Sequence, residues 1–101
     1  MMRAKTAEEV RDEFLATVHM LAHYWSIQPD KTERERCDGL AFSILGLLDG
    51  VNIGFPPVDI SVINDEAIKA DAIEEGEDWY EPGMVINGDC YLHDLYYKRG
   101  E

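Results

Sequence analysis

Residues 32–50, TERERCDGLAFSILGLLDG, decide the fold. Thr32 and Glu35 have the spacing of a capping box, in which each side chain binds the other residue's backbone N–H at the start of a helix. Apolar side chains then recur every three or four positions, which is the period of one helix face. Gly50 stands where a left-handed cap ends a helix. The stretch therefore predicts a helix over residues 33–49.

The sequence before this helix predicts a partner for it. Thr6 and Glu9 form a second capping box, and an apolar stripe at helical spacing follows them. Pro29 ends the helix, because a proline pushes the preceding residue out of the helical conformation. These signals predict a helix over residues 7–27, and the short connection predicts an antiparallel hairpin of the two helices.

Small residues mark one side of the second helix. Gly39, Ser43 and Gly46 lie four and three positions apart, so that side lacks bulk. Each interior glycine costs about 1 kcal/mol of helix propensity, which close packing must offset. The spacing therefore predicts a groove that another helix or a strand approaches closely.

The second half of the chain has a different pattern. Residues 58–62, VDISV, alternate apolar and polar side chains, which predicts a half-buried strand, and residues 84–86, MVI, predict a second short strand before a turn. A short helix is expected over residues 66–73. A last short helix is expected from the spacing of four apolar or aromatic residues: Tyr91, Leu92, Leu95 and Tyr96.

These elements together predict a single small acidic domain over residues 1–101. The expected fold class is α+β, with the antiparallel two-helix hairpin packed on a small sheet or extended layer and a short helix at the C-terminus. No internal repeat or low-complexity stretch divides the chain.

The charge is strongly acidic, with 21 Asp and Glu against 9 Lys and Arg, a net charge of −12. This balance argues against direct binding of nucleic acid or of an anionic membrane through a basic face. Carboxylates occupy the N-terminal segment where a signal peptide would need an apolar stretch. We therefore expect a cytoplasmic protein with reduced cysteines, and the apolar pattern around Cys37 predicts that this thiol is buried.

Four residues have the side chains of a Cys-His₃ zinc site: His19, His23, Cys90 and His93. Their spacing differs from that of a zinc finger, and no second cysteine pair accompanies them. The EF-hand spacing of calcium ligands is met nowhere in the chain. We therefore expect no metal and no cofactor, and a small metal-binding protein is the weakest alternative.

Catalytic motifs are absent from the sequence. Cys37 and Ser43 are the candidate nucleophiles, but both lie in the middle of the second predicted helix. No Gly-x-Ser-x-Gly elbow and no glycine-rich phosphate loop occur. The sequence therefore predicts a protein that is not an enzyme.

The acidic residues gather between positions 65 and 81, where eight carboxylates accompany one base, Lys69. A solvated, solubilising loop is one interpretation of this run. A negative surface that meets a basic partner is the other, because aromatic side chains within the run supply anchoring area. The candidate partner-binding residues are Glu74, Glu75, Glu77, Asp78, Trp79, Tyr80 and Glu81.

Two segments carry a resemblance to known sequences. They are residues 34–45, RERCDGLAFSIL, with 48–50, LDG, and the tail with Trp79-Tyr80 and residues 92–98, LHDLYYK. Both resemble small bacterial and prophage-borne proteins of unassigned function. The likeness covers about half of the chain and concerns packing residues. It implies a phage or mobile-element origin and assigns no catalytic residue.

The function expected from these observations is that of a small acidic phage- or prophage-type interaction protein that binds a basic protein surface. Its most concrete form is an inhibitor in the nucleic-acid groove of a host defence complex, such as an anti-CRISPR or another DNA-mimic protein, since carboxylates can stand in for phosphates. The alternative is a structural homodimer or assembly subunit, with the small-residue groove of the second helix as its seam.

Overall fold

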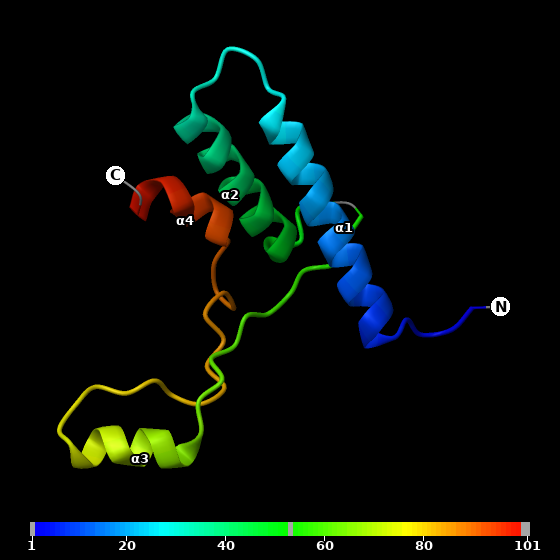
Figure 1. Ribbon diagram of the computed structural model, residues 1–101. Coiled ribbons are helices and arrows are strands. Elements are labelled where there is room, and N and C mark those ends of the chain that lie inside the picture. Colours follow the sequence, from blue (N-terminus) through cyan, green and yellow to red (C-terminus); the bar gives the residue numbers. More distant parts are fainter. Residues whose placement is uncertain (1, 53, 100–101) are drawn as a thin grey trace.

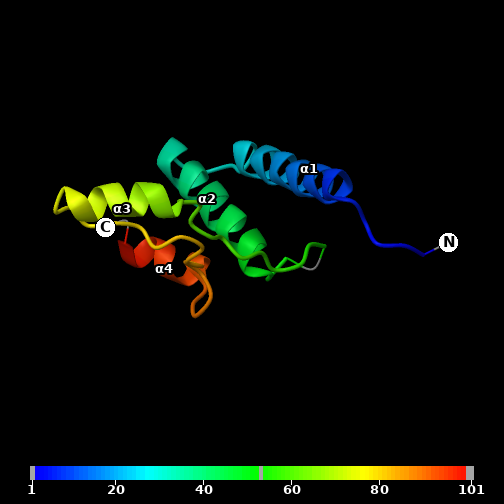
Figure 2. The same cartoon turned by 90° about the horizontal axis from the view of Figure 1, so that it is seen from below.

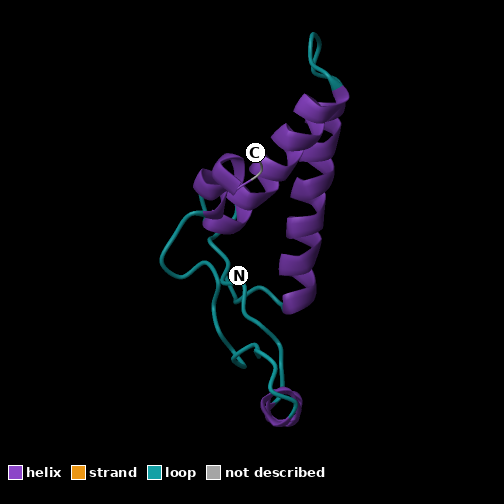
Figure 3. Ribbon diagram, turned by 90° about the vertical axis from the view of Figure 1, so that its left-hand side faces the viewer, coloured by secondary structure: helices purple, strands orange, loops and turns teal. Residues whose placement is uncertain are grey.

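The computed structural model describes residues 2–52 and 54–99, and the parts of the single-domain prediction that fall on residues 1, 53, 100 and 101 lie outside it. Within the described residues the fold is all-α, with four helices and no strand (Figure 1, Figure 3). The helices are α1 (Ala7–Ser26), α2 (Glu33–Asp49), α3 (Glu66–Glu74) and α4 (Leu92–Arg99).

The predicted hairpin of α1 and α2 is confirmed. Both capping boxes are formed: Thr6 Oγ1 accepts the N–H of Glu9 at 3.1 Å, and Thr32 Oγ1 accepts that of Glu35 at the same distance. Gly50 has φ of 85°, the left-handed conformation that ends α2. The two helices pack on each other, and α2 runs back along α1 (Figure 1).

The small-residue groove of α2 is filled from within the chain. A Cβ atom at Gly39 would lie 2.5 Å from ring atoms of Trp25, so the indole sits where any larger residue would extend. The indole Nε1 donates a hydrogen bond to Ser43 Oγ at 2.9 Å. The predicted close approach of another helix is therefore confirmed. At Gly39 and Ser43, α1 of the same chain occupies the groove that the alternative interpretation assigned to a second copy.

Helix α2 is the centre of the fold, because α1 packs on one part of it and α4 on another. Against α4, Phe42 packs edge-on to His93, and Tyr96 donates a hydrogen bond to Asp38 at 2.7 Å. Leu47, with 1% of its surface exposed, is the most buried large side chain of the described residues. The predicted burial of Cys37 is wrong, since its position in the first turns of α2 is exposed.

The predicted sheet is wrong. Residues 58–62 and 83–87 run antiparallel as a narrow ribbon, but only one bridge, between Ser61 and Val85, joins them. Three backbone hydrogen bonds accompany the bridge, and the N–H of Ile60 is taken by the side chain of Asn87 rather than by a carbonyl. Two strands without a third strand or a packed face are marginal in water, so the alternating pattern produces no regular strand here.

The molecule is open and flat. Its radius of gyration is 17.6 Å, while a compact chain of this length has about 13 Å, and its extents are 53 × 48 × 21 Å. Figure 2 shows the molecule edge-on, so that its thin dimension is visible, and Figure 3 shows α3 end-on, at the far end of the ribbon from the other helices. This shape separates the chain into a helical body and a projecting part.

Candidate functional site

The projecting part of the molecule is the acidic arm, defined as residues 62–84. It leaves the body at one segment of the ribbon, forms α3, and returns at the other segment (Figure 1). Eight carboxylates and one lysine give it a formal charge of −7, more than half of the net charge of the chain. Among the described residues, α3 packs against no other helix.

Local interactions alone hold the arm in shape. Asp65 caps α3 by accepting the N–H of Ile68 at 2.8 Å. Asn64 Nδ2 donates to the carbonyl of Tyr80 at 2.7 Å and so ties the outgoing chain to the returning one. Gly76 and Gly83 turn the chain with positive φ of 73° and 78°. A helix of this length is marginal without tertiary contacts, so the arm depends on these ties.

One cluster of side chains inside the arm is already paired. Lys69 Nζ lies 2.5 Å from Glu81 Oε1 and 5.9 Å from the centre of the Trp79 ring, and Trp79 Nε1 donates to Glu81 Oε2 at 3.1 Å. The hydrogen bonds from Lys69 and then Trp79 hold the pKa of Glu81 below its ordinary value. The arm's one base is therefore used within the arm.

The structure places the other predicted partner-binding residues on the exposed surface at the C-terminal end of α3 and in the segment that follows it. The described residues show no ion pair to Glu74, Glu75, Glu77 or Asp78. Tyr80 is 71% exposed and is held only through its backbone carbonyl. These carboxylates are thus available to cations from outside.

Sequence reasoning missed the apolar side chains of the arm. Ile63 is 98% exposed, and Ile68 and Ile73 on α3 are about half exposed. The three isoleucines are visible in the sequence as apolar residues within a run of carboxylates, but only the structure shows that no other element covers them. Single exposed apolar residues are normal on a protein surface, but this arm carries three exposed isoleucines together with exposed Trp79 and Tyr80. The arm therefore offers apolar area as well as negative charge.

A second group of residues joins α4 to α2. The carboxylate of Asp49, whose side chain is 1% exposed, accepts the N–H of Leu92 at 2.9 Å and that of His93 at 2.8 Å. His93 Nδ1 lies 2.6 Å from the same carboxylate, and it carries a proton because an ionised carboxylate can only accept. Burial raises the pKa of Asp49, but the hydrogen bonds from His93 and Leu92 outweigh it and lower the pKa.

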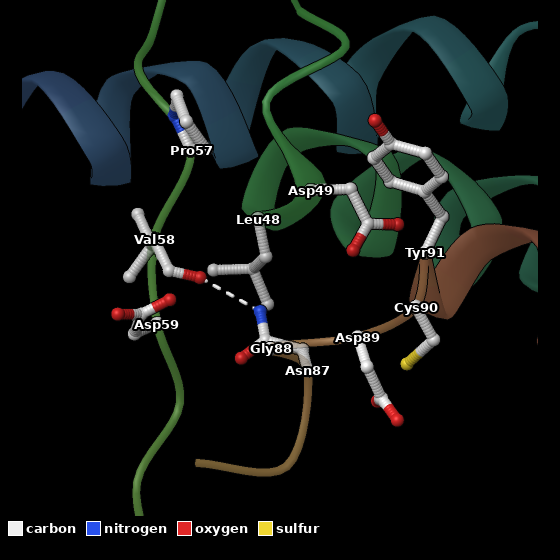
Figure 4. A pocket seen from close by; sticks show the side chains of 10 residues that line it. All are labelled: Leu48, Asp49, Pro57, Val58, Asp59, Asn87, Gly88, Asp89, Cys90 and Tyr91. Atoms are coloured by element: carbon white, nitrogen blue, oxygen red, sulfur yellow. Dashed lines mark hydrogen bonds between the residues drawn. The ribbon is translucent and has the colours of Figure 1, made fainter.

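A cavity of about 500 Å³ lies beside this cap, between the ribbon and the start of α4 (Figure 4). Asn87 closes its base by donating from Nδ2 to the carbonyl of Val58 at 2.8 Å. Three carboxylates line the cavity (Asp49, Asp59 and Asp89), and no basic side chain does. Such a lining disfavours phosphate and carboxylate groups, and both oxygens of Asp49 are committed to α4.

The four zinc-ligand candidates are not assembled. His93 is bound to Asp49, whereas His19 and His23 lie exposed on α1, and the Cys90 thiol faces the carbonyl of Ile86 at 3.9 Å. In residues 2–52 and 54–99, no group of three or more His, Cys, Asp or Glu side chains is placed to hold a metal ion. The absence of zinc stays a prediction.

No protein-family model, no curated protein and no solved structure matches this chain. Over the described residues, no helix has the length and apolar character that crossing a lipid bilayer requires. The arm is the part of the molecule with the most distinctive surface: it is strongly acidic, exposes aromatic and isoleucine side chains, and is separate from the body.

Proposed function

We propose that the protein is a non-enzymatic binding protein whose acidic arm docks on a basic surface of a partner protein. The observation that carries the proposal is the net charge of −7 on the acidic arm, whose helix packs on no other helix of the described residues. The carboxylates at the C-terminal end of α3 and just after it are exposed, so Lys and Arg side chains of a partner can pair with them. These carboxylates are Glu74, Glu75, Glu77 and Asp78.

The apolar side chains of the arm add a second requirement to this partner. Trp79, Tyr80 and Ile63 offer area that becomes favourable only when it is covered, and exposed aromatic residues are frequent anchors of interfaces. The partner surface therefore combines cations with apolar pockets. The nucleic-acid groove of a host defence complex has this chemistry, so we propose an inhibitor of the DNA-mimic or anti-CRISPR type, carried by a phage or prophage.

The test compares two variants with the same change of net charge. The arm variant carries Glu74→Gln, Glu75→Gln, Glu77→Gln and Asp78→Asn. The body variant carries the matched changes at exposed carboxylates of the body, Glu8→Gln, Asp12→Asn, Asp30→Asn and Glu33→Gln. Each protein is immobilised and exposed to a bacterial lysate at low salt, and bound proteins are eluted first with duplex DNA and then with salt.

The wild type and the body variant should retain the same proteins, and duplex DNA should release them. The arm variant should bind at least about fourfold more weakly, since each of four exposed ion pairs contributes about 0.2–1 kcal/mol. Equal losses in both variants would show that only net charge matters. Unchanged binding by the arm variant, or proteins that DNA does not release, would refute a DNA-mimic arm.

A further inference from the structure

The outer face of α1 carries an apolar stripe that the fold does not use. Met20, Tyr24 and Ile27 follow one another at spacings of four and three, so they lie on one side of the helix. They are 68%, 52% and 61% exposed, while the neighbouring side of α1 packs on α2, where the ring of Trp25 meets Gly39. The stripe is therefore open along the second half of α1.

This stripe lies in the least charged part of a highly charged chain. Residues 16–27 contain no Asp, Glu, Lys or Arg, although these residues make up 30% of the sequence. Toward the N-terminus the same side of α1 carries Glu9 and Glu13, and both are neutralised within the chain. Arg3 Nη2 lies 2.7 Å from Glu9, and Lys5 Nζ lies 2.6 Å from Glu13. The hydrogen bond from Arg3 lowers the pKa of Glu9 to about 2.

The accessible area of the chain leaves room for an interface. The chain exposes 8051 Å², whereas a compact monomer of 11.5 kDa exposes about 5,800 Å². The difference of about 2,200 Å² exceeds the roughly 800 Å² that each partner buries in an interface of standard size. The excess belongs to the open chain as a whole, and the stripe of α1 is one of its exposed apolar regions.

We propose that the stripe of α1 is the interface of a homodimer in which two α1 helices pack antiparallel around Met20 and Tyr24. Two chains with a net charge of −12 repel each other, so they associate only where carboxylates are absent or neutralised. The stripe meets that condition, whereas the acidic arm does not. The antiparallel arrangement places Glu9 and Glu13 of the two copies at opposite ends, away from each other.

The experiment introduces a charge, negative in one variant and positive in another, at the centre of the proposed interface. The mass is measured by light scattering after size exclusion, at a chain concentration of about 50 µM. This concentration is above the micromolar Kd expected for a weak interface of standard size. The wild type should show twice the 11.5 kDa mass of one chain. Met20→Glu and Met20→Lys should each be monomeric, because like charges meet near the twofold axis. An equimolar mixture of the two variants should recover the dimer mass, because the charges are then opposite.

The matched control is Ile63→Glu, which places the same charge on the fully exposed isoleucine of the arm and should leave the dimer intact. A wild-type protein at the mass of one chain would overturn the proposal, and so would a Met20→Glu variant that remains dimeric. A mixture that stays monomeric would show that the two Met20 positions do not meet. Dissociation by Ile63→Glu alone would place the contact on the arm. Partner binding by the arm is measured in the separate lysate experiment. Loss of the dimer in Met20→Glu therefore tests the homodimer and leaves the proposed function of the arm unaffected.

Discussion

Replacing Asp49 by asparagine should detach α4 from α2, although the two side chains have nearly the same shape. Three donors converge on the carboxylate: the N–H groups of Leu92 and His93 and the ring Nδ1–H of His93. An asparagine has one acceptor oxygen and one NH₂ group. Whichever way the amide is turned, its NH₂ points at a donor, so at least one N–H of α4 loses its partner.

The cost follows from the burial of the site. Leaving a buried N–H group without an acceptor costs about 1–3 kcal/mol, and a whole domain is stable by only about 5–15 kcal/mol. Helix α4 packs on α2 and on no other helix of the described residues. When α4 detaches, water can hydrogen-bond the N–H group that the asparagine leaves unpaired. We therefore expect the lost stability to appear first as local opening of α4 rather than as global unfolding.

The assay is amide hydrogen exchange across residues 92–99, combined with urea unfolding followed by circular dichroism. Asp49→Asn should lose protection in α4 while α1 and α2 stay protected. Asp59→Asn is the control, because Asp59 lines the same cavity but is exposed and should change stability by within about 0.5 kcal/mol. Protected α4 amides and wild-type stability in Asp49→Asn would refute the capping role of Asp49.

Because Asp49 must be ionised to accept these hydrogen bonds, the stability of the protein should depend on pH in the acid range. The pKa of Asp49 is lower in the folded protein than in the unfolded chain, so its contribution is fully present above the unfolded value of about 3.9. The contribution is lost as the pH falls through the lower, folded value. Between about pH 5 and pH 2 the wild type should therefore lose more stability than Asp49→Asn does, as measured by urea unfolding at each pH.

Three further predictions concern the body of the molecule. Gly39→Ala should lower the stability by about 1–3 kcal/mol, because the new methyl group meets the ring of Trp25; an unchanged Tm would contradict that packing. Leu47→Ala should cost about 2–5 kcal/mol in urea unfolding, since this side chain is 1% exposed. The purified protein should contain no stoichiometric zinc, and a one-to-one content lost on Cys90→Ser would overturn this expectation.

The helical hairpin could be predicted because its signals are local. Capping boxes, a helix-period stripe and a terminal glycine all lie within one or two turns of the positions they determine, so the structural bounds Ala7–Ser26 and Glu33–Asp49 agree with the predicted ones to within one residue. The short helix predicted over 66–73 is likewise confirmed as Glu66–Glu74. A local signal needs no knowledge of where the rest of the chain lies.

The sheet and the second cap could not be predicted in the same way. Alternation at residues 58–62 indicates a strand only if neighbouring strands exist, and the chain supplies a single short partner. The N-terminal cap of α4 comes from Asp49, 43 residues before Leu92, and no spacing rule connects the two. The exposure of the arm is also a tertiary property, because nothing in its sequence tells whether another element covers it.

The bridge between Ser61 and Val85 brings together the two ends of a 23-residue excursion, residues 62–84. A segment whose ends are adjacent can be shortened, lengthened or exchanged at little entropic cost, since loop closure depends only weakly on length. Under the proposed function, grafting the excursion onto an unrelated hairpin should transfer partner binding. A two-residue turn in its place should abolish that binding and leave a folded helical body.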